Sequence, residues 1–305
     1  MLTKPKNTIL TSSGYELDCR PEAFGYLKDS SDLLSKPDAL RSQMQEEGYL
    51  YIKSLLNPQD IQQARLEIAE ILAKKGNLEP GYPIQDCVAK PGLKMSFRPD
   101  LVTQSPTLKK LLYSGRMMEF FQIFLGGEVR PFDYTWFRAV APGFATYPHS
   151  DSVYMGRGTD ELYTAWTPLG DIPWDMGGLM ILEKSHRLEL IKNSYGRRDV
   201  DSYCTNRKTA QLYASGQKWW SGALSKNPVL LRSRYGGRWL SAEFEAGDVL
   251  IFNIFMIHAS LDNHSPSIRL SSDSRYQLAS EPIDERWIGE NPIGHSAAGK
   301  RGRIC

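Results

Sequence analysis

EAGDVLIFNIFMIHAS, residues 245–260, joins a turn to a run of apolar residues that reaches a histidine. The EAGD segment is typical of a turn, and the run 248–258 predicts a buried strand that ends at His258. This run is too short for a membrane span, which needs about 20 apolar residues, and it contains Asn253. It therefore predicts the core of a β-rich fold.

Five further short runs, separated by Gly, Pro, Asp and Asn, extend this pattern over about residues 129–280. They are FDYTWFRAV (132–140), ELYTAWTPL (161–169), GGLMILEKS (177–185), WLSAEFEA (239–246) and SIRLSSDSRYQL (267–278). Residues 1–128 are mostly helical in pattern. Helices are expected before Gly48, over 58–75 after the capping residue Asn57, and as one helix over 105–127. Strands following helices predict an α+β chain with helices on one face of a β-sandwich or jelly roll, in a single domain, 1–305.

Composition limits the function classes. The chain has 305 residues and a formal net charge of +2, so its overall charge gives no support for nucleic-acid binding. The start of the chain has no apolar run of signal-peptide length, and no stretch is long enough to span a membrane. The four cysteines are scattered without a CxxC pair, so neither a disulfide framework nor a thiolate zinc site is expected. A cytoplasmic protein without membrane or nucleic-acid partners is the expectation.

The segment TYPHSDSVYMG, residues 146–156, places His149 two residues before Asp151. In an extended segment these side chains point to the same side, so an imidazole nitrogen and a carboxylate oxygen can meet at one point. Together with His258 they would form the 2-His-1-carboxylate arrangement that suits non-haem Fe(II). The alternative for His258 is a hydrogen-bonded histidine at the end of a core strand.

Arg269 favours the metal interpretation. It follows His258 by eleven residues, at the start of the predicted strand 267–278. A buried arginine in a β-core needs an anionic partner, and its planar fork suits a carboxylate. The far carboxylate of 2-oxoglutarate, chelating iron at its other end, would be such a partner.

With these residues in place, the chain resembles the phytanoyl-CoA dioxygenase family of Fe(II)/2-oxoglutarate-dependent oxygenases. The matching segments are listed here in chain order: EEGYLYIKSLLNPQDIQQAR (46–65), HSD (149–151), YTAWTPLGDIPWDMGGLMILEKSHR (163–187), EAGDVLIFNIFMIHAS (245–260) and SIRLSSDSRYQ (267–277). The HxD pair alone is weak evidence. Its combination with the distal histidine, the eleven-residue step and the GGLMILEKSHR strand is specific.

The resemblance implies a double-stranded β-helix, or cupin-like jelly roll, that uses Fe(II), 2-oxoglutarate and O2. It implies that His149, Asp151 and His258 bind the iron and are the catalytic centre. The co-substrate residues that it implies are Arg269, Ser260, Trp166 and Lys94. Because the carboxylate ligand that halogenating relatives lack is present, hydroxylation of a small-molecule C–H bond is expected, with 2-oxoglutarate decarboxylated to succinate and CO2.

Residues 193–240 predict a long insertion between strands. They contain nine Lys or Arg residues and two acids, with Trp219 and Trp220 among them. We expect either a lid that contacts an anionic or aromatic substrate through some of its arginines, or a solvated loop. The oligomeric state and the substrate are not predicted.

Three other functions remain open. A cupin-like metal enzyme that is not an oxygenase would use the same triad, although it would not need Arg269. A ligand-binding relative without turnover is the second alternative. An oxygenase that acts on nucleic acid would draw on residues 193–240 and ranks last.

Overall fold

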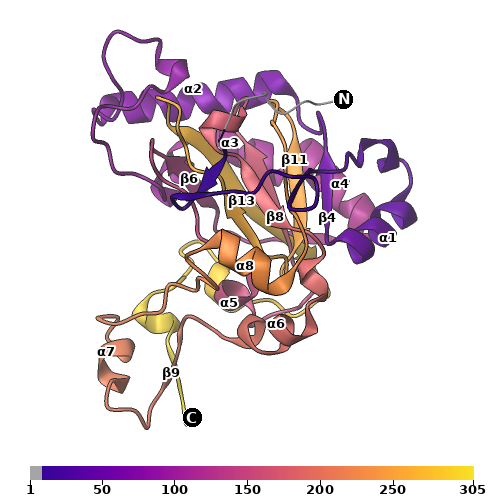
Figure 1. Ribbon diagram of the computed structural model, residues 1–305, viewed down its shortest axis with the longest axis vertical. Helices are drawn as coiled ribbons and strands as arrows, with labels where there is room; N and C mark the ends of the chain where they lie inside the picture. The colour runs from indigo at the N-terminus through magenta and orange to yellow at the C-terminus, as the bar shows by residue number, and fades with distance from the viewer. Residues whose placement is uncertain (1–8) are drawn as a thin grey trace.

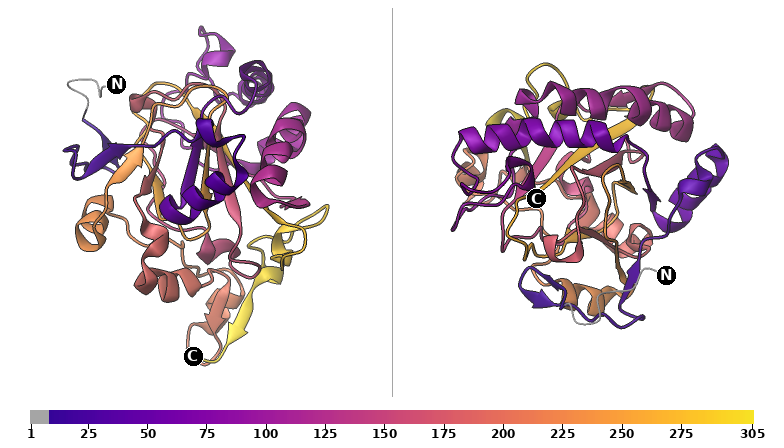
Figure 2. Two further views of the ribbon diagram at one scale, coloured as in Figure 1. Left: turned by 90° about the vertical axis from the view of Figure 1, so that its right-hand side faces the viewer. Right: turned by 90° about the horizontal axis from the view of Figure 1, so that it is seen from above.

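Two β-sheets face each other in the computed structural model, which describes residues 9–305, and helices cover the outer side of one sheet (Figure 1 and Figure 2). The larger sheet has the order β4 (Tyr49–Ile52), β11 (Val249–Asn253), β7 (Tyr163–Pro168), β13 (Arg269–Leu278) and β5 (Val129–Pro131), with β6 (Trp136–Val140) also paired to β13. The smaller sheet has the order β12 (His258–Ser260), β8 (Leu179–Leu182), β10 (Trp239–Ser241) and β3 (Phe24–Tyr26). This is the predicted α+β jelly roll. The first eight residues of the predicted helical part lie outside the described residues.

Side chains of the larger sheet alternate between two cores. Val249 and Ile251 of β11 pack with the helices, whereas Leu250 and Phe252 face the space between the two sheets. Successive residues of a strand point to opposite faces, so an apolar run such as 249–252 serves both cores. The inner core also receives Trp166 from β7.

Four helices of the N-terminal part cover the larger sheet, namely α1 (Pro37–Glu47), α2 (Pro58–Lys74), α3 (Pro106–Tyr113) and α4 (Gly115–Leu125). The side chain of Asn57 accepts a hydrogen bond from the Gln59 amide at 2.8 Å, which confirms the predicted cap of α2. The prediction of one helix over 105–127 was wrong. Ser114 is extended and its hydroxyl bonds the Lys110 carbonyl at 2.6 Å, which ends α3 before α4 begins.

The prediction of one strand over 248–258 was also wrong, because the structure has two strands there. β11 ends at Asn253, residues 254–257 cross from the larger to the smaller sheet, and His258 is the first residue of β12. The Asn253 side chain accepts a hydrogen bond from the Phe255 amide at 2.9 Å, which stabilises the turn. His258 therefore faces the inner space from the beginning of a strand.

The N-terminal segment contributes strands that were not predicted. Thr11–Ser12 (β1) pairs with Tyr15–Glu16 (β2) as a hairpin. β3 lies parallel to β10 and forms one edge of the smaller sheet. Parallel pairing between segments more than 200 residues apart has no local sequence signal.

The insertion over residues 193–240 is ordered and packs against the C-terminal tail. The insertion contains β9 (Ser202–Cys204), α7 (Ala210–Ala214) and α8 (Pro228–Tyr235). Two short helices precede these elements in the chain, α5 (Ser152–Met155) and α6 (Glu189–Asn193). β9 pairs in parallel with β14 (Arg301–Arg303), and the two strands lie together in the lower lobe of Figure 1.

A disulfide joins Cys204 to Cys305, at a sequence separation of 101 residues. The scattered cysteines gave no expectation of a disulfide framework, and this single pair was not predicted. The pairing of β9 with β14 brings the two Cα atoms to 5.5 Å, and sequence spacing cannot reveal such an approach.

Short 3-10 helices complete the chain, at Ser31–Leu33, Ile84–Asp86, Pro99–Gln104, Trp174–Met176, Ser185–Arg187, Tyr195–Arg197, Glu285–Trp287 and Ala297–Gly299. Across residues 9–305, none of the helices combines the length and the apolar character that crossing a membrane requires.

Candidate metal centre

His149 and His258 are held side by side by their own backbones. The amide of His149 donates to the carbonyl of His258 at 3.0 Å, and the reverse hydrogen bond measures 2.9 Å. The two rings have centroids 4.2 Å apart. Asp151 follows at the start of α5, and all three residues are buried.

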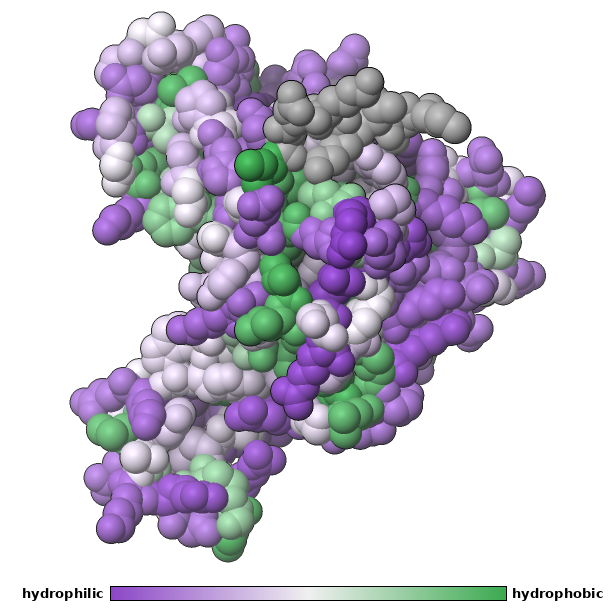
Figure 3. Space-filling view, viewed as in Figure 1, coloured by the Kyte–Doolittle hydropathy of each residue, from purple (hydrophilic) through white to green (hydrophobic). Residues whose placement is uncertain are grey.

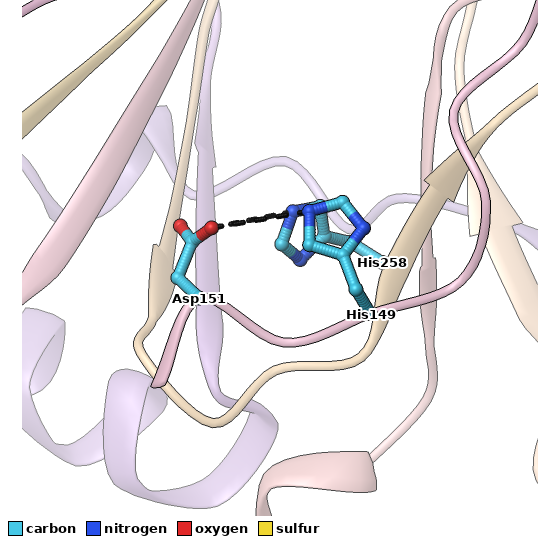
Figure 4. Close-up of side chains that lie close together, drawn as sticks. All are labelled: His149, Asp151 and His258. Atoms are coloured by element: carbon cyan, nitrogen blue, oxygen red, sulfur yellow. Dashed lines mark ion pairs between the residues drawn. The ribbon is translucent and has the colours of Figure 1, made fainter. Parts of the chain in front are cut away.

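The three side chains converge on one point (Figure 4). Oδ1 of Asp151 lies 4.0 Å from Nε2 of His149 and 3.8 Å from Nε2 of His258. The candidate ligand atoms all lie within 4.8 Å of one another. The structure thus brings together the three residues that the sequence predicted as metal ligands.

Each histidine presents the nitrogen that a metal needs. Nδ1 of His149 lies 2.7 Å from the carbonyl of Tyr147, and Nδ1 of His258 lies 3.0 Å from the carbonyl of Met256. A carbonyl only accepts, so Nδ1 carries the proton and the Nε2 lone pair is free. Burial, followed by the neighbouring His258, lowers the pKa of His149 to about 3, and burial also lowers the pKa of His258. Both rings are therefore neutral at pH 7.

Asp151 is fixed by two donors on its other oxygen. Oδ2 accepts from the hydroxyl of Thr164 and from Nη2 of Arg275, the latter at 2.9 Å. Burial alone would raise the pKa of Asp151, but the charge of Arg275 and the other neighbours outweighs burial, and the pKa is lowered. The carboxylate stays ionised, with Oδ1 turned toward the histidines.

Arg275 is a site residue that the sequence analysis did not find. Its Nη1 donates to the carbonyl of Asp273 at 2.9 Å, and its guanidinium carbon lies 4.2 Å from the centroid of a Trp136 ring. The alternation of β13 was an available signal, because residues 269, 271, 273 and 275 must share one face. What the alternation could not show is that this face meets Asp151.

Arg269 lies in the same interior with part of its guanidinium unsatisfied. It is 1% exposed, one terminal nitrogen donates to the carbonyl of Gly177, and Nε has no partner among the described residues. Burial, and then the charge of Arg138, lowers the pKa of Arg269 to about 10, so it remains protonated at neutral pH. A buried cation with an open donor fits the carboxylate of a co-substrate.

The other predicted co-substrate residues are placed differently. Ser260 is buried in β12, and its hydroxyl accepts from the Thr146 amide at 2.9 Å. Trp166 is buried between the sheets, edge-on to Phe244 at 4.6 Å. Lys94 is exposed and lines a smaller hollow, and it is not among the residues that line the cavity beside the triad.

That cavity has a volume of about 1230 Å³ and reaches His149 and Asp151. Its wall is rich in aromatic side chains, which are Phe97, Tyr134, Trp136, Phe144, Tyr147, Tyr154, Trp219 and Trp287. In Figure 3 the outline of the molecule is indented between an upper lobe and the lower lobe.

Segments far apart in the chain complete this wall. The insertion contributes Trp219, Ser221 and Ala223, and the tail contributes Gly294 and His295. The tail is held to the insertion, because Nδ1 of His295 lies 2.7 Å from the buried carboxylate of Asp201. Within residues 9–305, none of the insertion's nine basic residues lines the cavity. Part of the insertion therefore lines the cavity, and its arginines do not.

Comparisons with known proteins agree with this site. The sequence model of the family described as Phytanoyl-CoA dioxygenase (PhyH) matches residues 44–271. A 1-deoxypentalenic acid 11-beta-hydroxylase of Streptomyces exfoliatus is 25% identical over 273 residues, which cover 83% of this chain and 85% of that protein.

Two solved structures illustrate the shared fold. The epimerase SnoN from nogalamycin biosynthesis, in complex with Fe3+, alpha ketoglutarate and nogalamycin RO, is 17% identical with a TM-score of 0.55, covering 85% of this chain and 93% of that one. EctD from S. alaskensis with 2-oxoglutarate and 5-hydroxyectoine is also 17% identical with a TM-score of 0.55, covering 94% of each chain.

Proposed function

Because this chain belongs to the phytanoyl-CoA dioxygenase family, we propose that it is an Fe(II)- and 2-oxoglutarate-dependent dioxygenase that hydroxylates a C–H bond of a small molecule. The observation that carries the proposal is the convergence of His149, Asp151 and His258 on the wall of a large cavity. Two neutral imidazoles and one carboxylate match the donor set of non-haem iron, and they leave its other positions open.

The chain's own residues have distinct roles in this proposal. His149 and His258 bind the metal through Nε2, and Asp151 binds through Oδ1 because Oδ2 is held by Arg275 and a hydroxyl. Iron and 2-oxoglutarate, when bound, supply the oxidising chemistry that yields succinate, CO2 and a hydroxylated product. A substrate that fills this aromatic-lined cavity would exclude water from the reacting centre.

Arg269 binds the far carboxylate of 2-oxoglutarate in this proposal. Its open Nε and its burial supply a charged donor that has no acid as partner. The Ser260 hydroxyl accepts from a backbone amide, so its proton can be donated to the same carboxylate. Trp166 packs in the apolar core between the two sheets. Lys94 has no part in the proposal because it is exposed outside the cavity.

The relatives support hydroxylation in particular. The Streptomyces relative is a hydroxylase. EctD was solved with 2-oxoglutarate and with 5-hydroxyectoine, which is a hydroxylated compound. SnoN, which has the same fold, is an epimerase, so product analysis must follow any turnover. The presence of Asp151 argues against halogenation, which needs an open position in place of the carboxylate.

Anaerobic titration with Fe(II) and 2-oxoglutarate tests the proposal. The wild type is expected to develop the weak visible charge-transfer band of the iron chelate, and His149→Ala is expected to lose it with the fold retained. Metal binding without the band would refute the 2-oxoglutarate chemistry and favour a cupin-like enzyme. Binding of neither ligand would favour a non-catalytic relative of the fold.

A further inference from the structure

We propose that the substrate carries a single carboxylate on a bulky apolar body, and that Arg138 binds this carboxylate. The inference rests on the proposed function, and it names the substrate class of the same site. It is carried by the surroundings of Arg138, by the charges around the triad and by the character of the cavity wall.

Arg138 reaches the cavity from the middle of β6. Its Nε donates to Oδ2 of Asp273 at 3.1 Å, and its guanidinium carbon lies 5.6 Å from the centroid of Phe97. Within the described part of the chain, its two terminal nitrogens have no hydrogen-bond partner, and its side chain is 22% exposed. The open side of the fork is therefore available to a ligand in the cavity, which Arg138 lines. Such a fork suits a carboxylate in two-point contact.

The charges around the triad leave one cation without a counter-charge. Arg275 is paired with Asp151 and Arg138 with Asp273, whereas Arg269 has no acid as partner among the described residues. Fe(II) and 2-oxoglutarate carry two positive and two negative charges, so their binding does not change this surplus of one. A buried or half-buried surplus charge is costly. A monoanionic substrate would neutralise it, and Arg138 is the arginine with an open fork on the cavity side.

The remaining acid of the cavity wall, Asp262, forms no ion pair with an arginine among the described residues. Both oxygens of Asp262 are occupied, because they accept hydrogen bonds from the Thr11 hydroxyl at 2.6 Å and from the amides of Ser13 and Gly14 at 2.8 and 2.9 Å. These donors belong to the N-terminal hairpin. Asp262 thus holds that hairpin at the cavity and is not ion-paired with Arg138.

The cavity wall favours an apolar body for the rest of the substrate. The volume of about 1230 Å³ exceeds the usual range of small-molecule pockets, which is about 300–1000 Å³. Trp136 and Tyr134 lie near Arg138 on the same strand and the preceding turn, and they pack on each other at 4.6 Å. A fused-ring or similarly bulky hydrocarbon fits such a wall better than a small polar solute.

The basic insertion is not the anion site in this proposal. Arg197 is paired with Asp160 at 2.7 Å, Arg238 is paired with Glu183 at 2.6 Å, and Arg198 stacks on Trp220 at 3.9 Å. These side chains already have partners and lie outside the cavity wall. Arg198 is therefore a suitable control position.

Matched acid and ester probes test the assignment. Dehydroabietic acid and adamantane-1-carboxylic acid, each beside its methyl ester, are titrated into the protein while its tryptophan fluorescence is recorded. Three tryptophans line the cavity, so occupancy should quench the signal. The titrations use the wild type, Arg138→Gln, Arg138→Lys and the control Arg198→Gln, with Fe(II) and 2-oxoglutarate under anaerobic conditions and again without them.

The wild type and Arg198→Gln should bind at least one acid about tenfold or more tightly than its ester, as expected for a charge-assisted contact. Arg138→Gln should reduce that ratio to below about twofold, and Arg138→Lys should retain part of it, because the charge remains while the two-point contact is lost. The inference is overturned if no acid exceeds its ester in the wild type, or if Arg138→Gln keeps the preference. It is also overturned if Arg138→Gln weakens 2-oxoglutarate and leaves the probes unaffected. A missing chelate band in the wild type would instead refute the proposed function, while the metal-free titrations still decide the role of Arg138.

Discussion

Replacing Arg275 by methionine tests how far metal binding depends on the support of Asp151. The substitution keeps much of the apolar stem and removes the donor that lies 2.9 Å from Oδ2. A hydrogen bond to a charged group is worth about 1.5–3 kcal/mol, or about 10- to 150-fold in a binding constant. Supporting groups of metal ligands change affinity by about 10- to 100-fold. We therefore expect metal affinity to fall by about 10- to 100-fold.

A second substitution grades the effect. Thr164→Val removes the other donor to Oδ2 without changing a charge. This hydrogen bond also ends on the charged carboxylate, but its donor is neutral, so we place its loss at the lower end of the range for charged groups, about 1.5 kcal/mol or about 12-fold. The structure thus predicts the order wild type, Thr164→Val, Arg275→Met in decreasing metal affinity.

Cobalt(II) titration, followed by its visible absorbance, measures this order without redox chemistry. Arg130→Met is the matched control, because Arg130 is an exposed arginine of β5 on the same sheet. Circular dichroism establishes that each variant is folded. Removing the cation also removes its repulsion of the metal. If that effect were the larger, Arg275→Met would bind cobalt as tightly as the wild type or more tightly, and the support argument would be refuted.

Three further predictions concern other parts of the molecule. Arg269→Gln should weaken 2-oxoglutarate binding by about 10- to 150-fold with cobalt affinity unchanged; equal loss of both would contradict a co-substrate role. Lys94→Ala should change 2-oxoglutarate affinity by less than about twofold in the same titration, and a larger loss would restore Lys94 to the site. Burial would raise the pKa of Asp201, but hydrogen bonds from His295 and Lys300 outweigh burial and lower this pKa. The ionised Asp201 therefore stabilises the fold above its unfolded pKa of about 3.9, and this stabilisation is lost as the pH falls below that value. Asp201→Asn should therefore lower the melting temperature at pH 7 and differ less from the wild type at pH 3; a difference that is independent of pH would contradict the ion-pair account.

The metal ligands could be predicted because their signal is local. His149 and Asp151 are two residues apart, and the step from His258 to Arg269 spans one turn between strands. The strand pattern also gave the jelly roll, since alternation and turn residues report burial on each face. The ends of elements were less certain. An apolar run has the same sequence pattern whether it stays in one sheet or crosses to the other. The sequence therefore did not predict the break after Asn253.

The supporting residues could not be predicted because they depend on register. Arg138 lies opposite Ser271 in the pairing of β6 with β13, next to Asp273 on the same face. Nothing in FDYTWFRAV shows which strand will be its neighbour. The same limit applies to Arg275, whose partner Asp151 is 124 residues away in sequence.

The parts of the chain that surround the cavity differ in how firmly they are held. Arg138 is on β6, an edge strand of the larger sheet that pairs with β13 from residue 136 to residue 140, so its position relative to the triad is set by that pairing. Trp219 and His295 belong to the insertion and the tail, which are joined to each other through Asp201 and Cys204–Cys305. Precise contacts are better supported on strands than on loops. A substrate anion bound by Arg138 would therefore fix the orientation of the molecule above the metal, whereas the insertion and the tail would set the size of the apolar body that fits.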